Sequence, residues 1–133
     1  MSEVAGIGTD IIEIGRIGKA ITRYGERFLK RVFTSREREY CMYFSHPEQH
    51  YAGRFAAKEA IFKALGTGIR NEIRWQDVEI MANSYGKPEV VFSLHLKTLF
   101  PSSHVLVSIS HSREYATATA LLLQNRSLWN IKN

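Results

Sequence analysis

The chain has 133 residues, of which 44% are hydrophobic and 23% are charged. Because this balance is that of an ordinary globular protein, it excludes long disorder, collagen-like repeats and coiled coils, and we expect one domain over residues 1–133. The formal net charge is +5, and residues 15–38 hold eight basic against two acidic side chains.

The first half of the chain predicts one strand followed by helices. Glycines alternate with apolar residues in the strand, whereas apolar residues recur three and four positions apart in the first helix. The longest helix follows a break at His46-Pro47. In chain order, the predicted elements are a strand that turns toward a helix over residues 4–14, a helix over 16–24, a short helix capped by Thr34 or Ser35, and the longest helix over 48–65, which Gly66 ends.

The second half of the chain predicts a set of strands joined by short turns. With the helices of the first half, it favours an α+β fold of roughly three helices and a mainly antiparallel sheet. The predicted elements are strands over 76–82, 89–92, 105–110 and 115–123, turns at 85–88 and 111–114, and a short helix over 94–99.

Cysteine content and hydropathy indicate where the protein works. Cys41 is the only cysteine, so no intramolecular disulfide can form, which is typical of a reducing compartment. The first ten residues lack the apolar run of a signal peptide, and no stretch approaches the ~20 apolar residues that span a bilayer. We therefore expect a cytoplasmic protein that does not bind a membrane.

Asp10 is a lone carboxylate in an apolar segment, two residues after Gly8. The glycines before it let a ligand approach the backbone closely, and a partly enclosed carboxylate needs a cation, a hydrogen-bond donor or a metal as its partner. The alternative is that Asp10 caps the helix that follows. This fragment alone favours the cap.

The predicted helix over 48–65 is apolar or small on nearly every side, yet it carries four charges within ten residues. Such a helix is mostly buried, so its charges must be paired or must face a site. Glu59 and Lys63 are either an ordinary helix pair worth about 0.3 kcal/mol or a carboxylate for a cation beside an ammonium for phosphate. Gly66-Thr67-Gly68 follows at once and could bring backbone close to the same ligand. The four charged residues are Arg54, Lys58, Glu59 and Lys63.

A third polar segment, Ser108–Arg113, places His111 between hydroxyls at the end of a predicted strand. These side chains are donors suited to phosphate, although a polar turn explains the segment slightly better when it is taken alone. Proteins hold Mg²⁺ with one or two carboxylates plus substrate phosphates. The carboxylates and donors together therefore predict a magnesium-dependent enzyme that acts on a phosphoanhydride or a phosphodiester.

Other candidates carry less weight. His46 and His50 lie four residues apart and could bind zinc, but no further ligand is near them in the sequence, and a surface loop is the better interpretation. Cys41 is expected to be a packed thiol. The basic stretch over 15–38 is either a solvated helix face or a surface for nucleic acid, an anionic membrane or an acidic protein.

Four motifs occur in order: Gly6-Ile-Gly-Thr-Asp-Ile11, Gly53-Arg-Phe-Ala-Ala-Lys-Glu-Ala-Ile-Phe-Lys-Ala-Leu-Gly-Thr-Gly68, Gly86-Lys-Pro88 and Ser108-Ile-Ser-His-Ser112. Together they resemble the small bacterial 4′-phosphopantetheinyl transferases of the holo-[acyl-carrier-protein] synthase type. The likeness covers residues 5–122, and the long helix motif is its most specific part. The tail over 127–133 carries no family motif.

The resemblance implies the family's fold, in which a mainly antiparallel sheet packs against a long central helix and shorter N-terminal helices. It implies a reaction that moves 4′-phosphopantetheine from coenzyme A to a serine of apo acyl carrier protein and releases adenosine 3′,5′-bisphosphate. Asp10 and Glu59 would be ligands of the cofactor Mg²⁺, and Lys63 would lie against the pyrophosphate. All three would be catalytic, in a homotrimer with active sites between subunits.

Further site residues follow from the same resemblance. Glu59, or a water that it activates, is the candidate general base. Arg16 matches a family position on the helix that docks the carrier protein, and charge adds Arg23 and Arg27 to that surface. The residues expected to bind coenzyme A are Arg54, Lys63, Gly86, Lys87, Pro88, Ser110, His111 and Ser112.

Two rival functions remain open at this point. A nucleic-acid-binding module would explain the basic stretch and the pI of 9.5, but it would leave the enclosed carboxylates unexplained. A magnesium-dependent hydrolase of nucleotide phosphoanhydrides would share the metal site and would need no acceptor protein. We favour the transferase over both.

Overall fold

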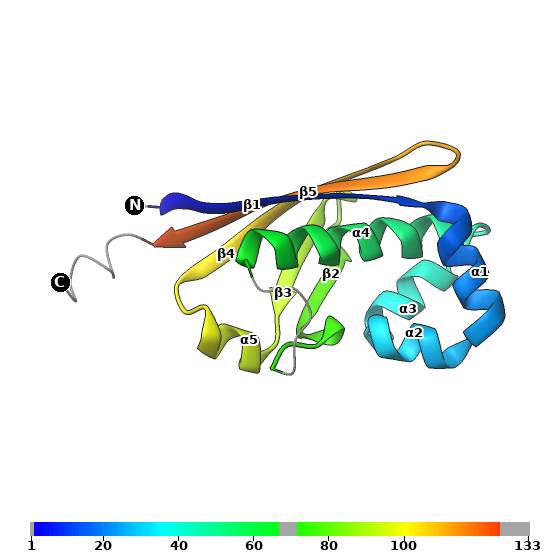
Figure 1. The fold of residues 1–133 in the computed structure, drawn as a ribbon, viewed down its shortest axis with the longest axis horizontal. Coiled ribbons are helices and arrows are strands. Elements are labelled where there is room, and N and C mark those ends of the chain that lie inside the picture. The colour runs from blue at the N-terminus through cyan, green and yellow to red at the C-terminus, as the bar shows by residue number, and fades with distance from the viewer. Residues whose placement is uncertain (1, 67–71, 126–133) are drawn as a thin grey trace.

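The computed structural model describes residues 2–66 and 72–125 (Figure 1). Its helices are α1 (Ile14–Tyr24), α2 (Glu26–Val32), α3 (Ser35–Met42), α4 (Pro47–Leu65) and α5 (Leu94–Leu99), with a 3-10 turn at Trp75–Asp77. Its strands are β1 (Ser2–Glu13), β2 (Val78–Ala82), β3 (Pro88–Phe92), β4 (Ser103–His111) and β5 (Tyr115–Asn125).

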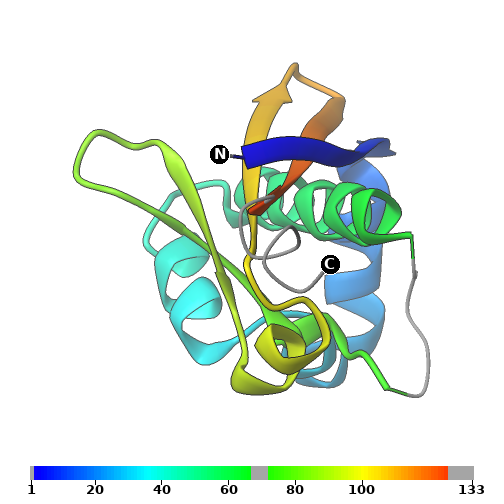
Figure 2. The ribbon, with the colours of Figure 1, turned by 90° about the vertical axis from the view of Figure 1, so that its left-hand side faces the viewer.

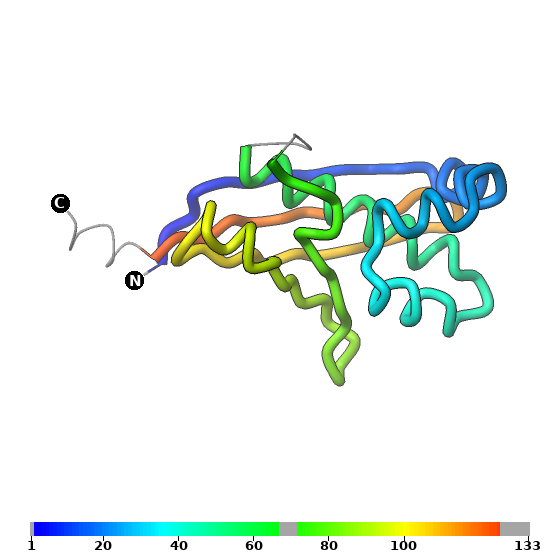
Figure 3. Tube along the Cα trace, turned by 90° about the horizontal axis from the view of Figure 1, so that it is seen from below, coloured from blue at the N-terminus to red at the C-terminus, as the bar shows by residue number. Residues whose placement is uncertain are grey.

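The strands form two antiparallel sheets, one on each side of α4. The larger sheet has the order β1-β5-β4, and β2 pairs with β3 in a separate hairpin. Seen from below, α4 runs along one face of the larger sheet, while α1, α2 and α3 gather beyond one end of it (Figure 3). The predicted α+β class and the antiparallel pairing are therefore confirmed.

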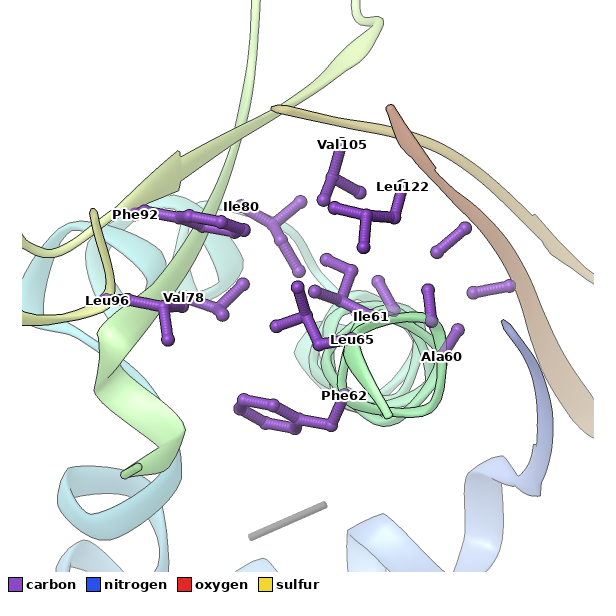
Figure 4. Close-up of a cluster of buried hydrophobic side chains, with 14 of the residues drawn as sticks. Ala60, Ile61, Phe62, Leu65, Val78, Ile80, Phe92, Leu96, Val105 and Leu122 are labelled. Carbon is purple, nitrogen blue, oxygen red and sulfur yellow. The ribbon is translucent and has the colours of Figure 1, made fainter. Parts of the chain in front are cut away.

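The core lies around α4, which is buried on several sides at once (Figure 4). Ile61 and Ala60 are fully buried. Leu122 and Val105 reach the helix from the larger sheet, and Ile80 reaches it from the hairpin. The helix has Pro47 in its first turn and ends at Gly66, which adopts the left-handed conformation that glycine tolerates.

Strand β1 crosses α4 with the two backbones in contact. A Cβ atom at Gly8 would lie 2.0 Å from the carbonyl oxygen of Ala60, and one at Gly6 would lie 2.1 Å from that of Ala64. No side chain larger than hydrogen fits at either position, so these glycines fix how closely and where the strand meets the helix. Asp10, two residues after Gly8, is thereby held beside the second half of α4.

The structure corrects several predicted elements. Asp10 lies inside β1 and does not cap a helix, because the strand runs on to Glu13, which is the N-cap position of α1. Helix α2 was not predicted, since it is only seven residues long and follows α1 after the single residue Gly25. The predicted single sheet is two sheets, and β4 and β5 are each longer than expected.

The predictions for Thr34 and Cys41 are confirmed. Thr34 is the N-cap of α3, where its hydroxyl accepts a bond from the Glu37 amide and the Glu37 carboxylate accepts one from the Thr34 amide. Cys41 is buried as a packed thiol, and burial raises its pKa to about 12. In the described part of the chain, no helix is both long and apolar enough to cross a membrane.

Candidate active site

The four charged side chains over residues 54–63 of α4 separate into structural and site groups. Lys58 is fully buried and uses all three of its ammonium protons, because Nζ donates to the carbonyls of Val32 and Trp75 at 2.8 and 3.1 Å and pairs with Glu37 Oε1 at 2.8 Å. Glu37 Oε2 accepts from the Ile80 amide at 2.7 Å. This pair joins α2, α3, α4 and β2 and has no free polar atom to offer a ligand.

On another side of α4, Glu59 and Lys63 face Asp10 of β1. Lys63 Nζ donates to the Thr9 carbonyl at 2.8 Å and lies 3.3 Å from Asp10 Oδ1. The Asp10 side chain is 18% exposed and that of Lys63 is 54% exposed, so solvent and ligands reach the group. The close crossing at Gly8 therefore brings Asp10 to Glu59 and Lys63, which lie about fifty positions later in the chain.

The electrostatics of this group favour a cation. Partial burial raises the pKa of Glu59, the neighbouring Asp10 raises it further, and Lys63 opposes both effects. Two carboxylates that repel each other in a partly enclosed place are stabilised by a divalent ion that takes oxygen ligands, so the donor set fits Mg²⁺. Asp10 and Glu59 are a pair of carboxylates, and in residues 2–66 and 72–125 no three or more His, Cys, Asp or Glu side chains form a group that could hold a metal ion.

A second polar group lies along the first half of α4. Gly53 packs so tightly on β4 that a Cβ atom there would lie 3.1 Å from Ile109 Cγ2. His111 ends that strand, and its charge and that of Arg54 both act on His50. Two residues predicted from separate motifs, Arg54 and His111, are thus brought to one place.

The turn at residues 86–88 lies apart from both groups. It closes the β2–β3 hairpin, whose tip projects away from α4 and the larger sheet (Figure 2). The Asn83 side chain holds the turn by accepting from the amides of Tyr85 and Lys87 at 2.8 and 3.0 Å, and Gly86 has a positive φ of 82°. An exposed turn that is held in one conformation in this way can contact a ligand bound to another protein molecule.

The two predicted serines also stand apart from His111. Ser110 alternates with His111 along β4 and so faces the opposite side of the sheet. The Ser112 hydroxyl accepts from the amides of Glu114 and Tyr115 at 3.4 and 3.2 Å, which is the polar-turn role considered from the sequence. Neither serine is brought to Asp10 within this chain.

The predicted docking arginines lie on exposed helix surface. Arg16 and Arg23 are seven residues apart on α1 and so share one face of it, and Arg27 follows on α2. Helix α1 continues directly from β1, so Arg16 lies six residues after Asp10 along one continuous path. A partner held on α1 would therefore sit next to the end of β1 that leads to the carboxylates.

Sequence reasoning missed two features of α4. It gave His50 no role, although the predicted helix over 48–65 contains His50 four residues before Arg54, on the same face. That spacing was the available signal. It also left Lys58 without a partner, because nothing in the sequence links it to Glu37, 21 positions earlier.

Comparison with known proteins places this geometry in context. Residues 6–120 match the model of the 4′-phosphopantetheinyl transferase superfamily. The chain is 56% identical over 116 residues to holo-[acyl-carrier-protein] synthase of Protochlamydia amoebophila, covering 87% of this chain and 95% of that one. It is 53% identical over 121 residues to the synthase of Chlamydia caviae, covering 91% and 98%.

Solved structures agree with the sequence comparison. A holo-(acyl-carrier-protein) synthase of Bacillus anthracis, in complex with CoA (3′,5′-ADP), superposes with a TM-score of 0.79 at 39% identity and covers 92% of this chain and 98% of that one. The Helicobacter pylori synthase in complex with coenzyme A has a TM-score of 0.80 at 33% identity, covering 87% and 98%.

Proposed function

The chain belongs to the 4′-phosphopantetheinyl transferase superfamily, and on that premise we propose that Asp10, Glu59 and Lys63 form the centre of its active site. The enzyme transfers 4′-phosphopantetheine from coenzyme A to a serine of apo acyl carrier protein. The observation that carries the assignment is the meeting of β1 and α4 at Gly8, which gathers two carboxylates and one ammonium at an accessible place.

Asp10 and Glu59 are the proposed ligands of Mg²⁺. An ion held there would supply positive charge for the pyrophosphate of coenzyme A and would relieve the repulsion between the two carboxylates. Lys63 now bonds to Thr9 and Asp10, and its 54% exposure leaves it free to turn toward an anionic substrate. At the pyrophosphate, its ammonium stabilises the charge that develops on the leaving adenosine 3′,5′-bisphosphate.

Glu59 is the proposed proton acceptor. The carrier serine attacks the phosphorus next to pantetheine, so its oxygen forms a new P–O bond, the P–O bond to adenosine 3′,5′-bisphosphate breaks, and the hydroxyl proton must leave. In the metal-free protein, partial burial and the adjacent Asp10 raise the Glu59 pKa, and a bound cation would oppose this increase. Glu59 takes the proton directly or through a water that it orients.

The nucleotide half of coenzyme A is assigned to Arg54 and His111, with the turn Gly86-Lys87-Pro88 and the hydroxyls of Ser110 and Ser112. The turn and Ser110 lie away from Asp10 in their own chain, so a neighbouring copy is the natural source of them. This is the main support for a homotrimer with active sites between subunits.

The outer face of the larger sheet supports the same assembly. Ile7, Leu121 and Leu106 form one row across β1, β5 and β4, and Ile7 is 64% exposed. A contiguous apolar row on an uncovered sheet face is typical of a surface that packs against another chain. A second copy of this chain is the proposed occupant.

The basic surface is assigned to the carrier protein. Arg16, Arg23 and Arg27 would meet acidic side chains of the carrier and raise its rate of encounter. A cytoplasmic location completes the proposal, in keeping with a single, buried cysteine.

The test is intact-protein mass spectrometry of an apo acyl carrier protein incubated with this protein, coenzyme A and Mg²⁺, beside a tube that contains EDTA. The expected result is a gain of one phosphopantetheine mass that EDTA abolishes. Release of adenosine 3′,5′-bisphosphate without a change in the carrier would favour the hydrolase instead. Neither product, together with salt-sensitive binding to bulk nucleic acid, would favour the binding module.

A further inference from the structure

His50 lies beside both residues assigned to the nucleotide half of coenzyme A. It precedes Arg54 by one turn of α4, and the positive charges of Arg54 and His111 both lower its pKa, after the larger effect of burial. Because the lowered pKa leaves the imidazole neutral at pH 7, it can take up a proton when an anion arrives. No resemblance to known motifs drew attention to this residue.

Aromatic rings hold the His50 imidazole in one orientation. The ring stacks on Phe44 with centroids 3.7 Å apart and an interplanar angle of 17°, and Tyr40 meets it edge-on at 6.1 Å. The Arg54 guanidinium lies over the same Tyr40 ring, with Cζ 4.1 Å from the centroid. The imidazole and the guanidinium therefore share one aromatic support and are placed together before any ligand binds.

Arg54 supplies a second, independent sign of a ligand. The residue is only 6% exposed, and its Nε atom has no hydrogen-bond partner within the described part of the chain. A buried donor without a partner costs free energy, and a cationic donor is satisfied best by an anionic oxygen. The buried guanidinium, the oriented imidazole and His111 make a donor set for a phosphate.

We propose that His50 is a third contact, with Arg54 and His111, for a phosphate in the adenosine 3′,5′-bisphosphate half of coenzyme A. The proposal rests on the function assigned above and adds a residue to it. His50 donates a ring N–H to a phosphate oxygen and becomes protonated as the complex forms. Its facing groups are Arg54 on α4, His111 at the end of β4, Tyr40 on α3 and Phe44 after it, and none of them is an acid that could take the place of the phosphate.

The test measures binding of adenosine 3′,5′-bisphosphate by titration calorimetry at pH 6 and pH 8, with the full-length protein and its His50→Gln variant. At pH 6 we expect the dissociation constant of the variant to be about 3- to 10-fold higher than that of the wild type, the loss of one hydrogen bond to a charged group at a half-exposed site. At pH 8 the two proteins should converge. The ligand's own phosphate titrates alike in both experiments, so the difference between the proteins isolates His50.

Two further variants serve as controls. His46→Gln removes an imidazole that is 72% exposed and pairs with Glu48, so it should bind the nucleotide as the wild type does. Phe44→Leu keeps His50 but removes the ring beneath it, and a smaller loss in the same direction is expected. Circular dichroism confirms that each variant is folded.

The outcomes separate this proposal from the transferase assignment. Equal affinity of the wild type and His50→Gln at pH 6 would overturn the role of His50, even if the carrier is modified normally. Wild-type nucleotide binding that His50→Gln weakens, without any modification of the carrier, would support His50 and overturn the transferase assignment. With active enzyme, KM for coenzyme A should rise while kcat and KM for the carrier stay the same.

Discussion

Helix α4 carries two lysine–carboxylate pairs five residues apart that have opposite properties. Lys58 and Glu37 are both fully buried, and Lys58 Nζ lies 2.8 Å from Glu37 Oε1. The neighbouring backbone satisfies their remaining polar atoms. Lys63 and Asp10 are 3.3 Å apart and partly exposed, and a second carboxylate, Glu59, stands beside them. The first pair has no capacity left to bind anything, whereas the second has an excess of negative charge that a cation can neutralise.

The difference teaches that burial together with complete hydrogen bonding separates a structural ion pair from a functional one. Both lysines read alike in the sequence, as charges on a largely apolar helix. What distinguishes them is how many partners the fold gives to each group. Replacing members of the two pairs tests this distinction directly.

Replacing Lys58 should have the largest effect, which is a loss of stability. Lys58→Met leaves Glu37 buried and charged without its partner, so we expect a loss of about 3–5 kcal/mol in the free energy of unfolding. Lys63→Met is the matched control and should change it by about 0.5 kcal/mol or less, since exposed pairs contribute little. Chemical denaturation measures both. Equal losses in the two variants would remove the distinction between the pairs.

Asp10 and Lys63 form the partly exposed pair, here called the open pair, and replacing either residue should lower turnover. Asp10→Asn and Lys63→Met each remove a charge that acts on the reacting phosphates, so kcat/KM for coenzyme A should fall about 10²- to 10³-fold. Folded Lys58→Met, assayed at low temperature and corrected for its folded fraction, should keep most of its activity. Normal turnover and normal Mg²⁺ dependence in Asp10→Asn would show that Asp10 is not a metal ligand.

Changing the docking surface should have a smaller effect, confined to one substrate. Arg16→Glu reverses a charge on α1 and should raise KM for the carrier protein about tenfold, with KM for coenzyme A unchanged. Lys97→Glu makes the same charge change on α5 and should leave both values near those of the wild type. If both KM values rise together in Arg16→Glu, docking and nucleotide binding are not separate.

The smallest expected effect is a gain in stability at the active site. The folded-state pKa of Glu59 is raised, so its ionised form destabilises the metal-free protein at pH 7. This destabilisation is lost as the pH falls through the folded-state pKa to the unfolded-state pKa of the same group. Glu59→Gln should therefore raise Tm of the metal-free protein at pH 7 by about 1–2 °C, a small gain because the group is largely screened by solvent. The difference from wild type should vanish near pH 4. A lower Tm for the variant at pH 7 would mean that Glu59 stabilises the fold.

The sequence predicted those parts of the fold that depend on neighbours along the chain. The length of α4, its stop at Gly66 and the capping of α3 by Thr34 follow from local rules and are confirmed. Helix α2 is too short for its periodicity to be recognised. The division into two sheets depends on which strands find each other in space, which single segments do not encode.

The site was predictable only in part, for the same reason. Asp10 and Glu59 could be named because their motifs resemble a known family, yet taken alone the Asp10 segment favoured a helix cap. Their meeting depends on the contact of Gly8 with Ala60, which brings together residues distant in the chain. The partner of Lys58 and the place of His50 beside His111 likewise exist only after folding. Thr67 and Gly68, which were expected to approach the same ligand, lie outside the described residues, as does the tail over 127–133.

The central claim is that the open pair with Glu59 holds the divalent ion that the transfer uses. The most direct measurement is anomalous diffraction from crystals grown with coenzyme A and soaked in Mn²⁺, an ion that can replace Mg²⁺ and scatters strongly. The account predicts one dominant peak about 2.0–2.3 Å from carboxylate oxygens of both Asp10 and Glu59, with Lys63 turned from Asp10 toward the pyrophosphate. A dominant peak elsewhere, or coenzyme A bound with Lys63 still on Asp10 and no ion between the carboxylates, would contradict it.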